Sequence, residues 1–187
     1  MSDEHDSPLR ERLEQFIGRP MGAGGPSSAP DPVNIPMIRH WVDAIDDQNP
    51  IYLDDEAARR THFGGVVAPP AMLQSWTMGR PTVQGLAERG GAPAAAAGRT
   101  ALGELDAAGY TATRATNSEL EFERYLRPGD ELTSHTELES ISDEKTTALG
   151  TGYFVTWVTS YVDQAGEVVG RQRFRVLKFR AATGAPA

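Results

Sequence analysis

The chain has 187 residues, of which 39% are hydrophobic and 24% charged, and its formal net charge is −8. These values are typical of an acidic globular protein of one domain, and they argue against nucleic-acid binding, which needs an excess of Lys and Arg. The sequence has no cysteine, so disulfides, zinc thiolate sites and a cysteine nucleophile are excluded and the cytoplasm is the expected compartment. It also lacks an apolar leader and any run of 18 apolar residues, so we expect neither secretion nor membrane insertion.

The first predicted element is a short amphipathic helix. Apolar residues follow helical spacing over residues 8–17, and Gly18 and Pro20 end the pattern. The next stretch, MGAGGPSSAPDPVN, is rich in Gly, Pro and Ser and is typical of a linker or wrapping loop. We therefore assign residues 1–33 to an N-terminal helix and linker.

A second helix is predicted at about residues 36–46. Asn34 is suited to cap it and Pro36 to open it. Its apolar residues recur at i, i+3, i+4 and i+7, and they are Ile38, Trp41, Val42 and Ile45. Such a stripe requires burial, so we expect this helix to lie in the core.

Shorter elements and a connection follow. Asp54 is placed to cap a short helix, and Pro69 and Pro70 open the segment AMLQSWTM. Residues 80–108 are rich in Gly, Ala and Pro, and the alanine run within them has no amphipathic face. We interpret residues 80–108 as a mobile lid or connection.

The second half changes to the two-residue period of β-strands. Strands are predicted from Thr111 to Leu126 and over 132–141, 152–162 and 168–179. Helices followed by antiparallel strands indicate an α+β domain, here residues 34–180, with 181–187 as a tail. The sheet's apolar face needs a helix against it, and the helix at 36–46 is the candidate.

The loop DDQNPIYLDD at residues 46–55 points to chemistry. It holds an acid, an amide and a proline, but Tyr52 stands where an imidazole would complete a general acid/base pair. Residues 47–54 resemble the G-D-x-N-P-I-H-x-D loop of the MaoC-like enoyl-CoA hydratases and (3R)-hydroxyacyl dehydratases, which are hot-dog folds. The stretches GGVVAPPAML at 64–73 and RYLRPGDEL at 124–132 are similar to the N-terminal, dehydratase-like members of that superfamily.

The resemblance implies a catalytic apparatus that is degenerate here. Hydration of an α,β-unsaturated thioester requires a base for water, an acid for the α-carbon and N–H donors for the enolate-like oxygen. The acid/base positions correspond to Asp47, Asn49 and Tyr52. The donor glycine of the family's A-H-G step corresponds to Pro70, and the preceding histidine to Pro69. Proline has no N–H, and a phenol is a poor base at neutral pH, so we expect an inactive isolated chain.

Each of these residues also has a simpler interpretation. Asp47 is suited to end the preceding helix and Asn49 to shape the turn before Pro50, both bonding to backbone, and we favour these roles over catalysis. We expect Tyr52 to be a buried aromatic. The predicted substrate-contacting residues are Pro69, Pro70, Ala71, Met72 and Trp76, which either pack in the core or form a wall for a large apolar acyl group.

A closer resemblance concerns partners. The stretches NIPMIRHWVDAIDDQNPIY, APPAMLQSWTM, DAAGYTATRATN and LKFR resemble the larger subunit of the actinobacterial steroid side-chain enoyl-CoA hydratases. This implies a smaller MaoC-like catalytic subunit as partner, an acyl-CoA substrate and no separate cofactor. It also implies a thiolase or aldolase that docks through a C-terminal zinc-ribbon and OB-like domain, which does not occur in this sequence.

Two other functions stay open at this point. One is a subunit of a (3R)-hydroxyacyl-ACP dehydratase in fatty acid elongation, and the other is a non-enzymatic acyl-CoA-binding scaffold. No metal site is predicted, because His40 and His135 have no partner at metal-ligand spacing. His62 is close in sequence to the loop but does not stand at the family's catalytic position, so we favour a surface residue over a pocket residue. An acidic row and a basic row are predicted to be cross-strand neighbours, forming ion pairs in preference to a site for CoA phosphates. These rows are Glu119, Glu121 and Glu123, and Arg171, Arg173 and Arg175.

Overall fold

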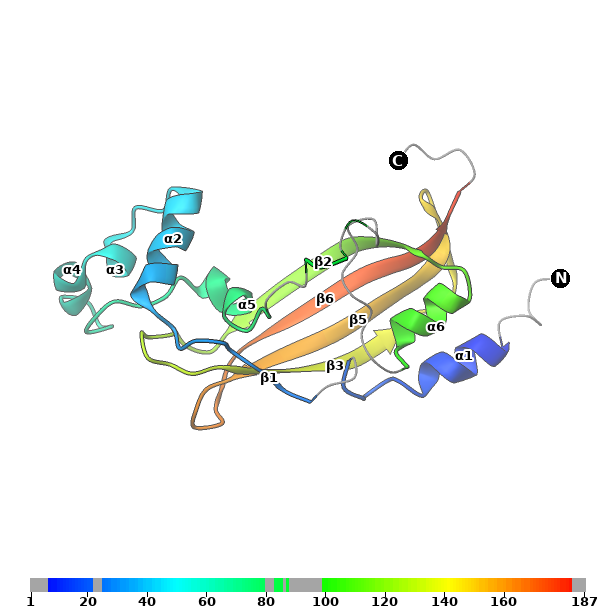
Figure 1. The fold of residues 1–187 in the computed structure, drawn as a ribbon, viewed down its shortest axis with the longest axis horizontal. Coiled ribbons are helices and arrows are strands. Elements are labelled where there is room, and N and C mark those ends of the chain that lie inside the picture. The colour runs from blue at the N-terminus through cyan, green and yellow to red at the C-terminus, as the bar shows by residue number, and fades with distance from the viewer. Residues whose placement is uncertain (1–6, 22–24, 80–82, 86, 88–98, 183–187) are drawn as a thin grey trace.

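The computed structural model describes residues 7–21, 25–79, 83–85, 87 and 99–182. Helices dominate the first part of the chain and long strands the second (Figure 1). The elements in chain order are α1 Ser7–Glu14, β1 Ser27–Ser28, α2 Ile35–Ile45, α3 Pro50–Leu53, α4 Asp55–Arg59, the 3-10 helix η1 Pro70–Met72, α5 Leu73–Trp76, α6 Ala101–Ala107, β2 Ala112–Phe122, β3 Thr133–Ile141, β4 Lys145–Thr147, β5 Gly150–Val162 and β6 Val168–Ala181. The predicted α+β class is confirmed.

One antiparallel sheet forms the centre of the protein. Its strand order is β1-β3-β5-β6-β2, and the short β4 pairs with the start of β5. A turn at residues 163–166 joins β5 to β6, and Gly166 in it has a φ of 81°, a conformation that a side chain disfavours. β5 and β6 are the longest strands, and the helices pack near their two ends.

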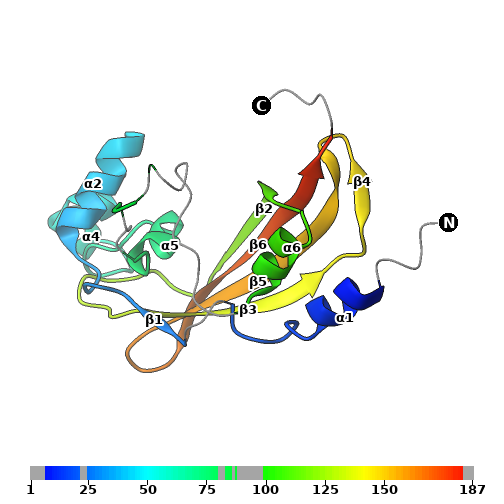
Figure 2. The ribbon, with the colours of Figure 1, turned by 45° about the vertical axis from the view of Figure 1, so that its right-hand side comes forward.

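Two apolar clusters lie on the sheet. The first joins α2, α3, η1 and α5 to residues Tyr161 of β5 and Val169 of β6. The second joins α1 and α6 to residues Leu138 and Val155 farther along the strands. Figures 1 and 2 show the same division: α2 to α4 stand to one side with α5 between them and the strands, whereas α1 and α6 lie towards the other end.

The helix predicted at 36–46 is α2, and its burial is narrower than its apolar pattern indicated. Asn34 caps it as expected, because its Oδ1 accepts a hydrogen bond of 3.0 Å from the Met37 N–H. Ile38 and Val42 are fully buried, whereas 55% of Ile45 is exposed. The expectation for Ile45 was wrong because α2 packs against one end of the sheet and its last turn projects beyond the cluster.

The interpretation of residues 80–108 as a lid or connection was wrong for its last part. Residues 101–107 form α6, in which Leu105 is fully buried, while residues 80–82, 86 and 88–98 lie outside the described residues. Thr100 caps α6 by accepting a hydrogen bond of 3.0 Å from the Gly103 N–H. Lys178 Nζ then donates to Asp106 at 2.5 Å. These contacts fix α6 over the end of β6.

The described part of residues 1–33, expected as a helix and linker outside the domain, adds to the sheet. Leu9 and Leu13 of α1 are buried in the second cluster. Farther on, Pro20 forms a bridge with Glu137, and β1 pairs with the start of β3. This segment therefore runs along the outer edge of β3.

The predicted neighbouring rows of acidic and basic residues are confirmed. The β2–β6 register places Glu119 opposite Arg173 and Glu121 opposite Arg171. The closest ion pair of Arg173 is with Glu139 on β3, at 2.7 Å, and this pairing lowers the pKa of the Glu139 carboxyl. Arg171 pairs with Glu123 at 3.0 Å. Because Arg173 reaches across β5, it links β2, β6 and β3 on the exposed face of the sheet.

Candidate active site

The loop at residues 46–55 begins with a left-handed residue that ends α2. Asp46 has a φ of 55°, and it caps the helix in the conformation that usually belongs to Gly or Asn. The Asp47 N–H then donates a hydrogen bond of 2.9 Å to the Val42 carbonyl. The end of α2 is thus at Asp46, and Asp47 starts the turn that follows.

Asp47 and Asn49 bond to the backbone, as predicted, but the expectation that Asp47 ends the preceding helix was wrong, because the left-handed Asp46 caps it. Asp47 Oδ1 accepts a hydrogen bond of 3.0 Å from the Asn49 N–H. Asn49 Oδ1 accepts one of 3.2 Å from the Ile51 N–H and so caps α3. Both side chains therefore shape the path by which the chain leaves α2 and enters α3.

Tyr52 is a buried aromatic residue within this turn, as expected. It is 8% exposed and belongs to the first apolar cluster. Burial, followed by the neighbouring Tyr125 phenol and the Asp47 carboxylate, raises the pKa of Tyr52 to about 12. At neutral pH this phenol is protonated, so it is a hydrogen-bond donor and not a base.

Tyr125 is a site residue that the sequence did not single out. It lies in the loop between β2 and β3, and its ring contacts Phe63 at a centroid distance of 4.6 Å. Phe63 in turn contacts His62 at 3.9 Å. The only signal in the sequence was the aromatic residue just before the RPGD turn, and its partners come from segments about 60 and 70 residues away, which a local pattern does not reveal.

The segment expected to replace the donor helix begins with two prolines. Pro69 precedes η1 and Pro70 starts it, so neither position offers a backbone N–H. The Pro69 carbonyl accepts a hydrogen bond of 3.0 Å from the Met72 N–H, and the Ala68 N–H donates one of 2.8 Å to the Leu126 carbonyl. Ala71, the next predicted substrate contact, is exposed. The backbone here is held against the β2–β3 loop.

The predicted wall residues divide between core and surface. Met72 is fully buried and Trp76 is 3% exposed, both in the first cluster, whereas Ala71 is exposed. Core packing thus describes Met72 and Trp76 well. Trp76 Nε1 is the only buried side-chain nitrogen or oxygen without a hydrogen-bond partner within the part of the chain that the structure describes.

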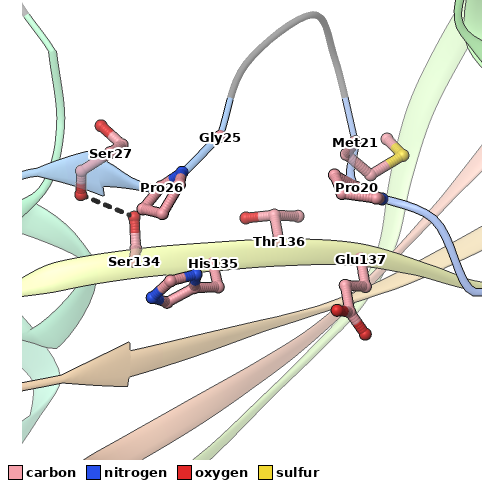
Figure 3. Close-up of a pocket in the computed structure, with 9 residues that line it drawn as sticks. All are labelled: Pro20, Met21, Gly25, Pro26, Ser27, Ser134, His135, Thr136 and Glu137. Atoms are coloured by element: carbon pink, nitrogen blue, oxygen red, sulfur yellow. Dashed lines mark hydrogen bonds between the residues drawn. The ribbon is translucent and has the colours of Figure 1, made fainter. Parts of the chain in front are cut away.

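A separate pocket lies on the edge of β3, away from this loop. It has a volume of about 180 Å³ and is bounded by Pro20, Met21 and residues 25–27 on one side and residues 134–137 on the other (Figure 3). Ser134 Oγ donates a hydrogen bond of 3.4 Å to the Ser27 carbonyl at its wall. No predicted site residue lines this pocket.

The described part of the chain has neither a candidate metal site nor a membrane-spanning helix. His40, His62 and His135 are exposed, and across residues 7–21, 25–79, 83–85, 87 and 99–182 no group of three or more His, Asp or Glu residues could hold a metal ion. Among the same residues, no helix is long and apolar enough to cross a membrane.

The sequence matches a known protein family. The model of the family described as "FAS1-like, dehydratase domain region" matches residues 16–172. The chain belongs to this FAS1-like dehydratase family. The chain is also 51% identical over 172 residues to a probable enoyl-CoA hydratase alpha subunit of Thermomonospora curvata, covering 91% of this chain and 51% of that protein.

A second curated relative comes from Mycobacterium tuberculosis. This FAS1-like dehydratase chain is 42% identical over 182 residues to its 3-oxo-4,17-pregnadiene-20-carboxyl-CoA hydratase alpha subunit, covering 97% of this chain and 55% of that protein. The chain therefore spans about half the length of the curated relatives it matches.

Solved structures similar to this chain confirm the predicted hot-dog fold. A chain of the ChsH1-ChsH2 complex from Mycobacterium tuberculosis is 39% identical and superposes with a TM-score of 0.78, covering 96% of this chain and 95% of that chain. The MaoC-like dehydratase of Rhodospirillum rubrum is 26% identical with a TM-score of 0.55, covering 87% and 94%. The MaoC-like resemblance read from the sequence is likewise confirmed.

Proposed function

We propose that this chain is the non-catalytic, substrate-shaping subunit of a heteromeric enoyl-CoA hydratase that acts on a bulky acyl-CoA. The observation that carries the proposal is the state of Tyr52. It occupies the position where the MaoC-like loop has its histidine, and its pKa of about 12 keeps the phenol protonated at neutral pH. A protonated phenol cannot take the proton from the attacking water.

The prolines at 69 and 70 support the same proposal independently. In hydration of an enoyl thioester, negative charge develops on the thioester oxygen, and backbone N–H donors stabilise it. Neither Pro69 nor Pro70 has such a hydrogen. Tyr52 therefore replaces the imidazole and Pro70 replaces the N–H donor at the positions that correspond to the MaoC-like sequences, which is the pattern of a subunit that leaves catalysis to a partner.

The partner we propose is a smaller MaoC-like subunit with an intact D-x-N-P-I-H loop. It would supply the carboxylate and imidazole that activate water and protonate the α-carbon, together with the N–H donors for the thioester oxygen. The structural match to a chain of the two-component ChsH1-ChsH2 complex supports this arrangement. The present chain would hold the acyl group and complete the assembly.

A bulky, steroid-like acyl group is the proposed substrate class. It is supported by the name of the Mycobacterium tuberculosis relative, a pregnadiene carboxyl-CoA hydratase subunit. Met72 and Trp76 belong to the apolar cluster around the degenerate loop, and Met and Trp suit broad apolar surfaces. We propose that this cluster borders the space for the acyl group.

The test is co-expression of the chain with a smaller MaoC-like protein from the same genome. Hydration is measured with short, long and steroid-type enoyl-CoA substrates, using the chain alone, the small protein alone and the pair. The proposal predicts turnover of the bulkiest substrate by the pair and none by the chain alone. Preference for acyl-ACP would indicate the fatty acid elongation dehydratase instead, and acyl-CoA binding without turnover by the pair would indicate a scaffold.

A further inference from the structure

A buried glutamine on the sheet connects four elements beneath the candidate site. Gln172 of β6 is 5% exposed. Its Nε2 donates hydrogen bonds of 3.1 Å to Gln74 Oε1 on α5 and to Ser118 Oγ on β2. Its Oε1 accepts a bond of 3.4 Å from the hydroxyl of Tyr161 on β5. Both ends of the buried amide are thus satisfied, and one of its bonds leaves the sheet for α5.

The neighbouring position on β6 provides a second attachment for α5. Gly170 lies two residues before Gln172, so both face the same side of the sheet. A Cβ built on Gly170 would lie 2.6 Å from Leu73 Cδ2. The Leu73 side chain therefore occupies the space that a larger residue at 170 would fill.

These two contacts hold a helix that is too short to hold itself. α5 spans four residues, and isolated helices of that length are not stable in water. It continues directly from η1, which begins at Pro70, and it carries the buried Trp76. The positions of Met72 and Trp76, the predicted wall residues, therefore depend on how Leu73 and Gln74 contact β6.

We infer that Gln172 is a positioning residue that, together with Gly170, seats α5 on the sheet and thereby sets which acyl groups the neighbouring site accepts. The effect on acyl-group selection rests on the proposed function. The placement of α5 on the sheet does not, because it concerns only contacts within this chain. Gln172 acts through Gln74 and not on the substrate.

The chain offers a matched pair of variants for the test. Gln74→Ala removes the bond from Gln172 to α5, and Ser118→Ala removes the other bond from the same Nε2 atom to β2. Gln74 and Ser118 are both exposed, so neither substitution opens a core cavity. Each variant loses one hydrogen bond, but only Gln74→Ala removes a bond between α5 and the sheet.

The first measurement is amide hydrogen exchange of residues 71–76 in the purified chain. Gln74→Ala is expected to raise exchange there about three- to tenfold, the population change that matches loss of one ordinary hydrogen bond. Ser118→Ala is expected to leave it unchanged. Equal exchange in the two variants, or no change in Gln74→Ala, would contradict the claim that Gln172 holds α5 on the sheet through Gln74.

The second measurement uses the pair formed with the smaller MaoC-like subunit. Gln74→Ala is expected to lower kcat/KM for the bulky enoyl-CoA about three- to tenfold, mainly through KM, and to leave a short enoyl-CoA unaffected. Ser118→Ala should match the wild type on both. An equal loss on both substrates, or an unchanged ratio, would overturn the role in specificity. If the wild-type pair hydrates neither substrate, the proposed function fails. Hydrogen exchange still tests whether Gln172 holds α5 on the sheet.

Discussion

The Tyr52 phenol lies beside that of Tyr125, and burial together with this neighbour and the Asp47 carboxylate raises the pKa of Tyr52 to about 12 from the ordinary 10.0. A phenol whose pKa is raised on folding makes its full contribution to stability when the pH is below its pKa in the unfolded protein. That contribution is lost as the pH rises through its pKa in the folded protein. The phenol thus supports folding at neutral pH, and this support declines between about pH 10 and pH 12.

Tyr52→Phe is therefore expected to reduce the loss of stability at alkaline pH. The variant should lose less free energy of unfolding than the wild type between about pH 10 and 12. Urea denaturation at several pH values measures this, and the ultraviolet difference spectrum between the two proteins isolates the titration of Tyr52. A Tyr52 titration near the ordinary value of 10 would contradict the burial described here.

The sequence predicts the features of this fold and site that depend on neighbouring residues better than those that depend on contacts between distant segments. The Asn34 cap, the Asn49 turn and the β2–β6 charge pairs follow from signals within a few residues or from strand register, and they are present as predicted. Such features depend on local backbone geometry, which propensity and spacing describe well.

Features that depend on tertiary packing were missed. The helix α6 was hidden by Gly103 and the surrounding alanines, although Thr100 and the buried Leu105 were its signals. Tyr125 gained its importance from contacts with distant segments, and Ile45 is exposed because α2 meets only one end of the sheet. Periodicity predicts which side of an element is apolar, but not what covers it.

Gly170 is expected to tolerate no side chain. In Gly170→Ala the new Cβ would lie 2.6 Å from Leu73 Cδ2 and 2.7 Å from the Glu121 carbonyl oxygen. The resulting overpacking should lower the free energy of unfolding by roughly 1–3 kcal/mol. Urea denaturation checks this value. Gly79→Ala is the matched control, because a Cβ at Gly79 meets nothing within 4 Å, and equal stability of the two variants would contradict the close approach of α5.

Asp163 is expected to support stability at neutral pH but not in acid. Arg124 Nη2 donates to it at 2.9 Å, and this bond, with the backbone N–H groups of Glu167 and Ala165, lowers the pKa of the Asp163 carboxyl. A lowered carboxyl pKa stabilises the fold above the unfolded value, and the contribution is lost as the pH falls through the folded value. Asp163→Asn should therefore cost about 1 kcal/mol at neutral pH.

The difference between Asp163→Asn and the wild type should shrink as the pH falls below the ordinary aspartate range. Chemical denaturation at neutral pH and at about pH 3 measures it. Asp143→Asn is a suitable control, because Asp143 is 80% exposed and its ion pair with Arg10 is 3.5 Å long, so it should change little. A difference that persists unchanged in acid would show that the Asp163 charge is not the cause.

The most direct test of the central claim is hydration of a bulky enoyl-CoA by the purified chain, by its Tyr52→His variant and by the chain paired with a smaller MaoC-like subunit. We predict no turnover by the first two, because Pro69 and Pro70 offer no N–H even when an imidazole is restored, and turnover by the pair. Sustained hydration by the chain alone, or by Tyr52→His alone, would contradict a subunit that shapes the substrate site without catalysing the reaction.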